Sequence, residues 1–160
     1  MAASAPGAGK REAFERLVHK LAVHEVAEQE VVRPLTRKAP EGDAVAEARL
    51  EEESKGKDRI AELEKMGVDD ARFDGRLESL RSEVLAHAER EEREEHPKLK
   101  QAVDEGQLQN LVSLFHGAEK TAPTHPHPKG PESAVGNLIV GPFAAIADRA
   151  RDAIRDARKK

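Results

Sequence analysis

The stretch HEVAEQEVVRPL, residues 24–35, places a His and a Glu where a helix would normally present apolar side chains. It belongs to a longer run whose members recur at alternating steps of three and four, the spacing of one face of an α-helix. The run consists of Phe14, Leu17, Leu21, His24, Glu28, Val31 and Leu35. A helix is therefore predicted from about Arg11 to Arg37, with two polar residues on its apolar face.

The same arrangement recurs in HAEREEREEHPKL, residues 87–99, where His87 and Glu91 continue an apolar face. Both stretches begin His-x-x-x-Glu, and both carry a Pro ten residues after the His, at Pro34 and Pro97. A Pro inside a helix removes a backbone hydrogen bond and costs about 3 kcal/mol unless it ends or kinks the helix. Because both helices carry this unfavourable Pro at the same offset from the His, the two motifs are predicted to share one design.

Between these two helices, a further helix is predicted from about Asp43 to Met66, with Gly67 as its left-handed C-terminal cap. Its apolar stripe also contains a carboxylate, Glu53. The third helix is predicted over about 71–104. The whole chain is predicted to divide into a flexible start (1–10), a helical bundle (11–117), a Pro- and His-rich linker (118–135) and a C-terminal amphipathic helix (136–160).

The composition favours an all-α bundle of a single domain. The chain has 160 residues, of which 36% are charged and 2% are aromatic, and it contains no Cys. Thiolate metal sites and disulfides are thereby excluded. No stretch approaches the roughly 20 apolar residues that a membrane span needs, and there is no apolar leader, so a cytoplasmic protein is expected. The net charge of −4, with both signs interleaved, argues against nucleic-acid binding.

The polar residues on the apolar faces predict a metal site. A His and a Glu four residues apart lie on the same side of a helix. Burying an unpaired carboxylate costs several kcal/mol, and no Lys or Arg is expected on the same faces near these positions, so a metal ion is the economical partner. Histidine and carboxylate ligands from facing helices are typical of di-iron or di-manganese bundles, with zinc as a further alternative. Glu92 is a neighbour that could replace or assist Glu91.

With these motifs identified, the chain resembles the hemerythrin-like, or HHE cation-binding, domain family, in particular its actinobacterial members. The resemblance rests on LAVHEVAEQEVVRPL, RLEEESKGKDRIAEL and VLAHAEREEREEHPKL, and it covers about residues 11–100. It implies an up-down four-helix bundle around a non-haem di-iron centre. In that family the centre serves reversible dioxygen binding, oxygen or iron sensing, peroxide decomposition or nitric oxide handling.

Carried over by position, the resemblance implies that His24 and His87 are terminal iron ligands and that Glu28 and Glu91 bridge two ions. Glu53 would stand where relatives often have a His. The metal ligands expected from motif and resemblance together are His24, Glu28, Glu53, His87, Glu91 and Glu92.

One departure from the family pattern concerns its first helix, which carries one or two further His ligands. Here only MAASAPGAGKRE precedes the helix that contains His24, so three of the four bundle helices are expected, as in an N-terminally truncated bundle. The fourth place could be filled by residues 107–117, by the C-terminal helix, or by a second copy of the chain in a homodimer.

The expected function is that of a non-haem di-iron protein in oxygen or peroxide chemistry, or in iron handling or sensing, with manganese and zinc ranked behind iron. Dioxygen or peroxide would be its small-molecule ligand, and any enzymatic activity would be peroxide decomposition. The rival hypothesis is a metal-free helical interaction module, a degenerate bundle that binds a partner or its own copy.

Overall fold

The computed structural model describes residues 7–121, 142–157 and Lys159, and all regular structure within them is helical. The predicted all-α class with a C-terminal helix is confirmed. Residues 1–6 of the predicted flexible start and 122–135 of the predicted linker lie outside the described residues. The elements are α1 (Ala8–Ala27), η1 (Glu28–Val32), α2 (Arg33–Thr36), α3 (Gly42–Met66), α4 (Phe73–Arg90), η2 (Glu91–Glu95), α5 (His96–Ala102), α6 (Glu105–Thr121) and α7 (Pro142–Ala157).

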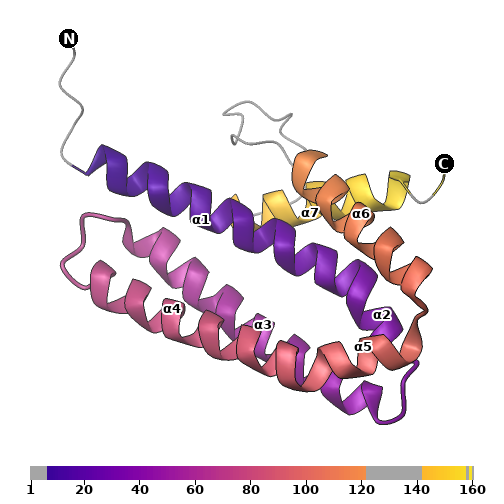
Figure 1. Cartoon of the computed structure of the whole chain (residues 1–160). Helices are drawn as coiled ribbons and strands as arrows, with labels where there is room; N and C mark the ends of the chain where they lie inside the picture. Colours follow the sequence, from indigo (N-terminus) through magenta and orange to yellow (C-terminus); the bar gives the residue numbers. More distant parts are fainter. Residues whose placement is uncertain (1–6, 122–141, 158, 160) are drawn as a thin grey trace, which may run out of the picture.

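Three long helical rods correspond to the three helices predicted from the sequence (Figure 1). The first consists of α1, η1 and α2, the second is α3, and the third consists of α4, η2 and α5. α3 and α4 form a hairpin, and Gly67 caps α3 with a positive φ of 79°, as predicted, although its ψ of 154° lies outside the left-handed helical region. Each rod carries its polar motif residues near mid-length or in its second half, so the three sets meet inside the bundle.

Both His-x-x-x-Glu motifs lead into a π-helical segment of five residues, which begins at the Glu of the motif. Each segment ends directly before a short α-helix that carries the matched Pro, Pro34 or Pro97, in its first turn. A π-helical turn is wider, with hydrogen bonds between residues five apart. The wider turn accommodates the backbone carbonyl to which a Pro, having no N–H, cannot donate a hydrogen bond. The π-helical turn is therefore the structural reason that both prolines lie at the same distance from the His of their motif.

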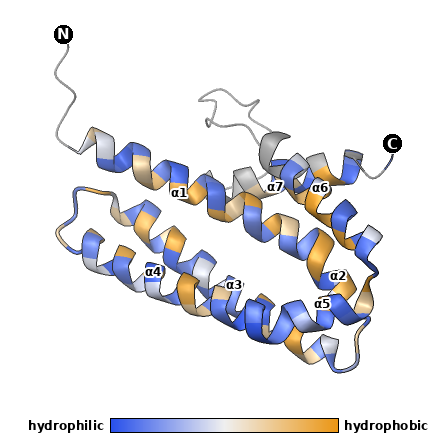
Figure 2. Ribbon diagram, in the orientation of Figure 1, coloured by the Kyte–Doolittle hydropathy of each residue, from blue (hydrophilic) through white to orange (hydrophobic). Residues whose placement is uncertain are grey.

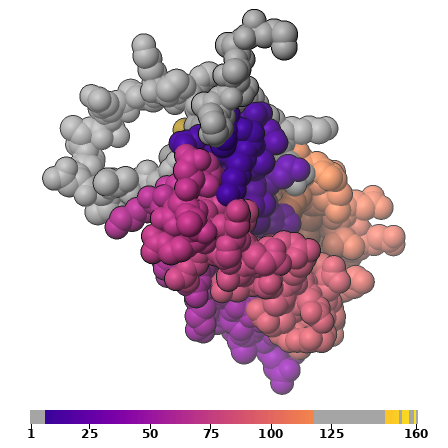
Figure 3. Space-filling model, turned by 90° about the vertical axis from the view of Figure 1, so that its left-hand side faces the viewer, coloured from indigo at the N-terminus to yellow at the C-terminus, as the bar shows by residue number. Residues whose placement is uncertain are grey.

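The apolar core is built largely by α1 and completed by the C-terminal helix. α7 packs along α1, and Ala147, Ala150 and Ile154 of α7 are buried in the same core as the apolar face of α1. α6 also contacts α1. Figure 3 shows α1 between α6 and the α3–α4 hairpin. The bundle was predicted to be completed by residues 107–117, by the C-terminal helix or by a second copy of the chain. The first two of these segments, which lie in α6 and α7, both pack onto α1.

Polar residues dominate where α4 leads through η2 into α5 (Figure 2). This part of the sequence is the charged run 89–95, yet Glu91 and Glu95 within it are buried. The burial of these two carboxylates calls for partners inside the bundle.

Among the described residues, no helix is both long and apolar enough to cross a membrane.

Candidate metal centre

Four of the predicted ligands come together in the middle of the bundle. They are Glu28 at the start of η1, Glu53 in α3, His87 near the end of α4 and Glu91 at the start of η2. Each offers one ligand atom, and these atoms lie within 4.8 Å of one another. The three Glu residues are buried, and His87 is partly buried. Three separate rods thus present an imidazole and three carboxylates to one point.

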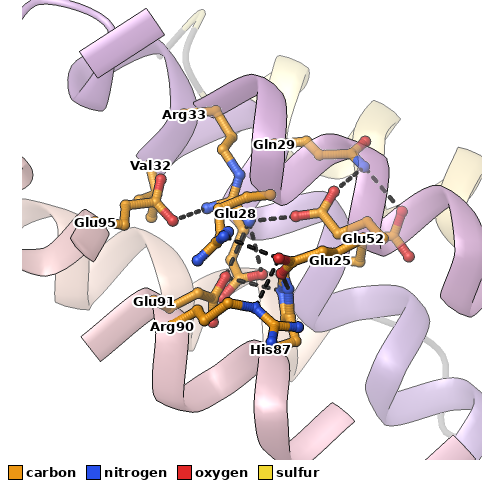
Figure 4. A network of polar contacts seen from close by, with 12 residues as sticks. Glu25, Glu28, Gln29, Val32, Arg33, Glu52, His87, Arg90, Glu91 and Glu95 are labelled. Atoms are coloured by element: carbon orange, nitrogen blue, oxygen red, sulfur yellow. Dashed lines mark hydrogen bonds and ion pairs between the residues drawn. The ribbon is translucent and has the colours of Figure 1, made fainter. Parts of the chain in front are cut away.

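The ring of His87 is oriented by a contact on each nitrogen (Figure 4). Nε2 faces the cluster and lies 3.0 Å from Oε1 of Glu91, while Nδ1 lies 2.7 Å from Oε2 of Glu52. Glu52 is itself held by Arg49 at 2.9 Å and by Arg90 at 2.7 Å. A carboxylate on the outer nitrogen of a ligating His fixes the tautomer and leaves the inner nitrogen for a metal.

The electrostatics of the metal-free cluster favour a charged His87. Burial alone would lower the pKa of His87, but its contacts with Glu91 and Glu52 outweigh burial and raise this pKa to about 9. Burial would raise the pKa of Glu91, but His87 and Arg33 together lower it. The pKa of Glu28 is raised, chiefly by burial and against the effect of His24. A metal that binds Nε2 of His87 must therefore displace a proton.

The two remaining predicted ligands lie outside this group of four. Nε2 of His24 lies 2.9 Å from Oε1 of Glu28, but the His24 side chain is 52% exposed and its ring packs edge-on against Phe115, with centroids 5.3 Å apart. Glu92 is exposed, because it follows Glu91 on the outer side of η2. The structure thus brings His24 to the edge of the cluster and leaves Glu92 on the surface.

The prediction that no basic residue lies near these carboxylates is wrong, because Arg33 is buried among them. Its side chain is 3% exposed and forms ion pairs with four carboxylates. Nη2 contacts Oε1 of Glu53, lies 2.9 Å from Oε1 of Glu91 and lies 3.6 Å from Oε2 of Glu28. Nη1 contacts Oε2 of Glu95. Arg33 stands five residues after Glu28, and the π-helical turn puts residues five apart on one face.

Two further polar groups fix the carboxylates that surround Arg33. Thr36 donates a hydrogen bond from Oγ1 to Oε1 of Glu95, at 2.9 Å, and both residues are fully buried. Gln29 donates from Nε2 to Oε2 of Glu53, at 2.6 Å, and to Oε1 of Glu25, at 2.8 Å. These hydrogen bonds orient carboxylates whose rotation would otherwise disperse the cluster.

A cavity of about 740 Å³ lies beside the cluster, between α1, α3 and α4. All four clustered residues line it, and its apolar part is formed by residues of the three rods: Leu21, Ile60, Leu80 and Val84. A small molecule can therefore approach the four ligand atoms through a space that is partly apolar.

These features fit a metal ion. The donor set is one oriented imidazole and three carboxylates from facing helices, a combination that suits iron, manganese or zinc. The negative charge of the carboxylates exceeds the positive charge that Arg33 supplies, so a cation is favoured there. The fold and the cluster together define a helical-bundle protein with a site able to hold a metal cation.

Comparison with known proteins identifies the family. The family model described as the hemerythrin HHE cation binding domain matches residues 2–99. The chain is also 30% identical, over 139 residues, to an uncharacterized hemerythrin-like protein of Schizosaccharomyces pombe, covering 86% of this chain and 68% of that protein. The chain belongs to the hemerythrin HHE cation-binding domain family. No solved structure matches it.

Proposed function

We propose that this protein binds iron through Glu28, Glu53, His87 and Glu91 and uses it in oxygen or peroxide chemistry, or in iron handling or sensing. The observation that carries the proposal is the convergence of these four residues from three rods, with their ligand atoms within 4.8 Å of one another. The family to which the chain belongs is defined by cation binding. Iron supplies the redox chemistry that dioxygen and peroxide require.

Iron is preferred over the other candidates because of the donor set. Three carboxylates and one imidazole offer hard oxygen donors with one nitrogen. Zinc in proteins is usually held by fewer carboxylates and more nitrogen or sulfur, and manganese favours sites richer in oxygen ligands. Manganese and zinc therefore remain second choices at this site.

The cavity beside the cluster supports a small neutral ligand. Leu21, Ile60, Leu80 and Val84 give its walls an apolar part, against which an uncharged molecule such as dioxygen or peroxide can pack, while charged residues line much of the remainder. His24 lies at the edge of the cluster, in contact with Glu28, and also lines the cavity. His24 is therefore placed to exchange a proton with a ligand that enters from this side.

A metal-free interaction module is the second candidate, and the burial of Arg33 favours it. The guanidinium already offsets part of the carboxylate charge, so the bundle has a partner for these groups without a metal. In this alternative the exposed faces of the bundle would bind a partner or a second copy of the chain. The two functions differ in metal content.

The experiment that tests the proposal is metal analysis of matched variants. Protein purified without chelator, and again after anaerobic loading with ferrous iron, is expected to retain iron in the wild type and in Glu92→Gln, and to lose it in Glu91→Gln. Glu91 is buried in the cluster and its neighbour Glu92 is exposed, so the pair separates loss of a ligand from loss of a charge. Less than about 0.2 equivalents of iron in the loaded wild type would contradict iron binding and favour the interaction module.

A further inference from the structure

The guanidinium of Arg33 lies among the carboxylates of the cluster, and Arg33 is not one of the residues that line the cavity. It contacts one oxygen of each clustered carboxylate: Oε1 of Glu53, Oε1 of Glu91 and Oε2 of Glu28. A carboxylate that bridges two metal ions uses one oxygen for each ion. With Arg33 in place, one oxygen of each of these three residues already lies beside a cation. The other oxygen of Glu53 accepts a hydrogen bond from Gln29, and the other oxygen of Glu28 lies 2.9 Å from Nε2 of His24, so each of these carboxylates has at most one oxygen to offer to a metal ion.

Arg33 is held firmly in this position. Its other terminal nitrogen contacts Glu95, which is 1% exposed and accepts a hydrogen bond from Thr36 at 2.9 Å. Arginine keeps its charge at all accessible pH values, so Arg33 cannot become neutral to leave the cluster. Moving it out would bury Glu95 without its cation and open the core near α2, which is unfavourable.

For ferric iron, the charge of the cluster supports the same conclusion. Four carboxylates contact the guanidinium, and with Arg33 they carry a net formal charge of −3. One ferric ion would neutralise this charge, whereas one ferrous ion would leave −1 and two ferrous ions would leave +1. Two ferric ions would leave +3 in a buried site, which is strongly disfavoured unless further anions enter.

We propose that this chain holds one metal ion, bound by Glu28, Glu53, His87 and Glu91, and that Arg33 takes the place of a second ion. This inference rests on the proposed function and concerns the number of ions alone. It departs from the two-ion centre that the family resemblance implied. Arg33 acts as a fixed internal cation that limits the site to a single metal.

The test is the metal stoichiometry of the full chain and of two variants. After anaerobic loading with ferrous iron and removal of unbound iron by gel filtration, the wild type is expected to contain about one equivalent of iron. Arg33→Met keeps the length of the side chain but removes its charge, and it is expected to bind about two equivalents. Arg37→Met is the control, because Arg37 directly follows α2 and pairs with Asp43 and Glu47 at the surface, away from the cluster, and it should stay at about one.

A spectroscopic measurement on the wild type covers the case in which Arg33→Met does not fold. Manganous ion loaded into the wild type should give the electron paramagnetic resonance signal of isolated ions, whereas a two-ion site would give the signal of a magnetically coupled pair. Two equivalents and a coupled signal in the wild type would overturn the inference while leaving iron binding intact. A folded Arg33→Met variant that still binds one equivalent would overturn the role of Arg33. Binding of no metal by the wild type would overturn the proposed function itself.

Discussion

Replacing Arg33 by Met is expected to lower the free energy of unfolding of the metal-free protein by about 3–5 kcal/mol. The side chain is 3% exposed and pairs with four carboxylates that are themselves buried. Removing one partner of a buried ion pair leaves the other charge without compensation in a medium where it is poorly solvated. The measurement is chemical denaturation followed by circular dichroism, in the presence of chelator.

Arg37→Met provides the control for this stability prediction. Arg37 lies four residues further along the chain, directly after α2, but it pairs with Asp43 and Glu47 at the surface. Exposed ion pairs contribute about 0–1 kcal/mol, so the control should be close to the wild type. If Arg33→Met lost no more than Arg37→Met, the buried carboxylates would have to be neutralised by protonation, and Arg33 would not be their main partner.

Saturating the metal-free protein with ferrous iron under anaerobic conditions is expected to raise its stability by about 2.7–4.1 kcal/mol at free iron of 100 to 1,000 times the dissociation constant. For a chain of this size the melting temperature should rise by about 5–16 °C. The physical reason is that the ion binds ligands brought together by three rods in the folded state alone. Differential scanning calorimetry before and after addition of chelator measures the shift.

Two substitutions in α3 make this second prediction specific to the cluster. Glu53→Gln removes a buried ligand and should abolish most of the shift caused by metal. Glu51→Gln removes a carboxylate that pairs with Lys55 on the surface, and it should leave the shift unchanged. A melting curve that does not respond to chelator in the wild type would count against occupancy of the site.

The fold was largely predictable because its helices follow regular periodicity. The apolar steps of three and four predicted rods at about 11–37, 43–66 and 71–104, and the structure has residues 8–36, Gly42–Met66 and residues 73–102 for the same rods. Composition also favoured helices over sheets, since the chain has few aromatic residues. Which segments would pack on α1 was less predictable, because packing between distant segments is not encoded in local spacing.

The site was predicted in part, and the misses have a common cause. Arg33 was overlooked because α-helical spacing rotates it away from Glu28, whereas the π-helical turn brings it back to the same face. The matched prolines are the sequence signal that could have indicated an irregular turn. Glu95 follows Glu91 by four residues, so the same spacing that selected His87 and Glu91 could have found it.

Glu52 was missed for a different reason. It lies next to Glu53 in the sequence, so it points to a different side of α3, and its role depends on the position of His87 on another helix. Nothing in the local sequence specifies that contact. Glu92, in contrast, was predicted as a ligand and is exposed. The choice between the adjacent residues Glu91 and Glu92 depends on the register of η2, and the structure shows that Glu91 is the buried one.

Anomalous diffraction from a crystal of the iron-loaded protein would show whether iron binds where the three rods converge. One anomalous peak is expected at the iron absorption edge, within bonding distance of Glu28, Glu53, His87 and Glu91 and next to an unmoved Arg33. A crystal that contains iron elsewhere, or that shows no peak among these four residues after loading, would contradict this expectation.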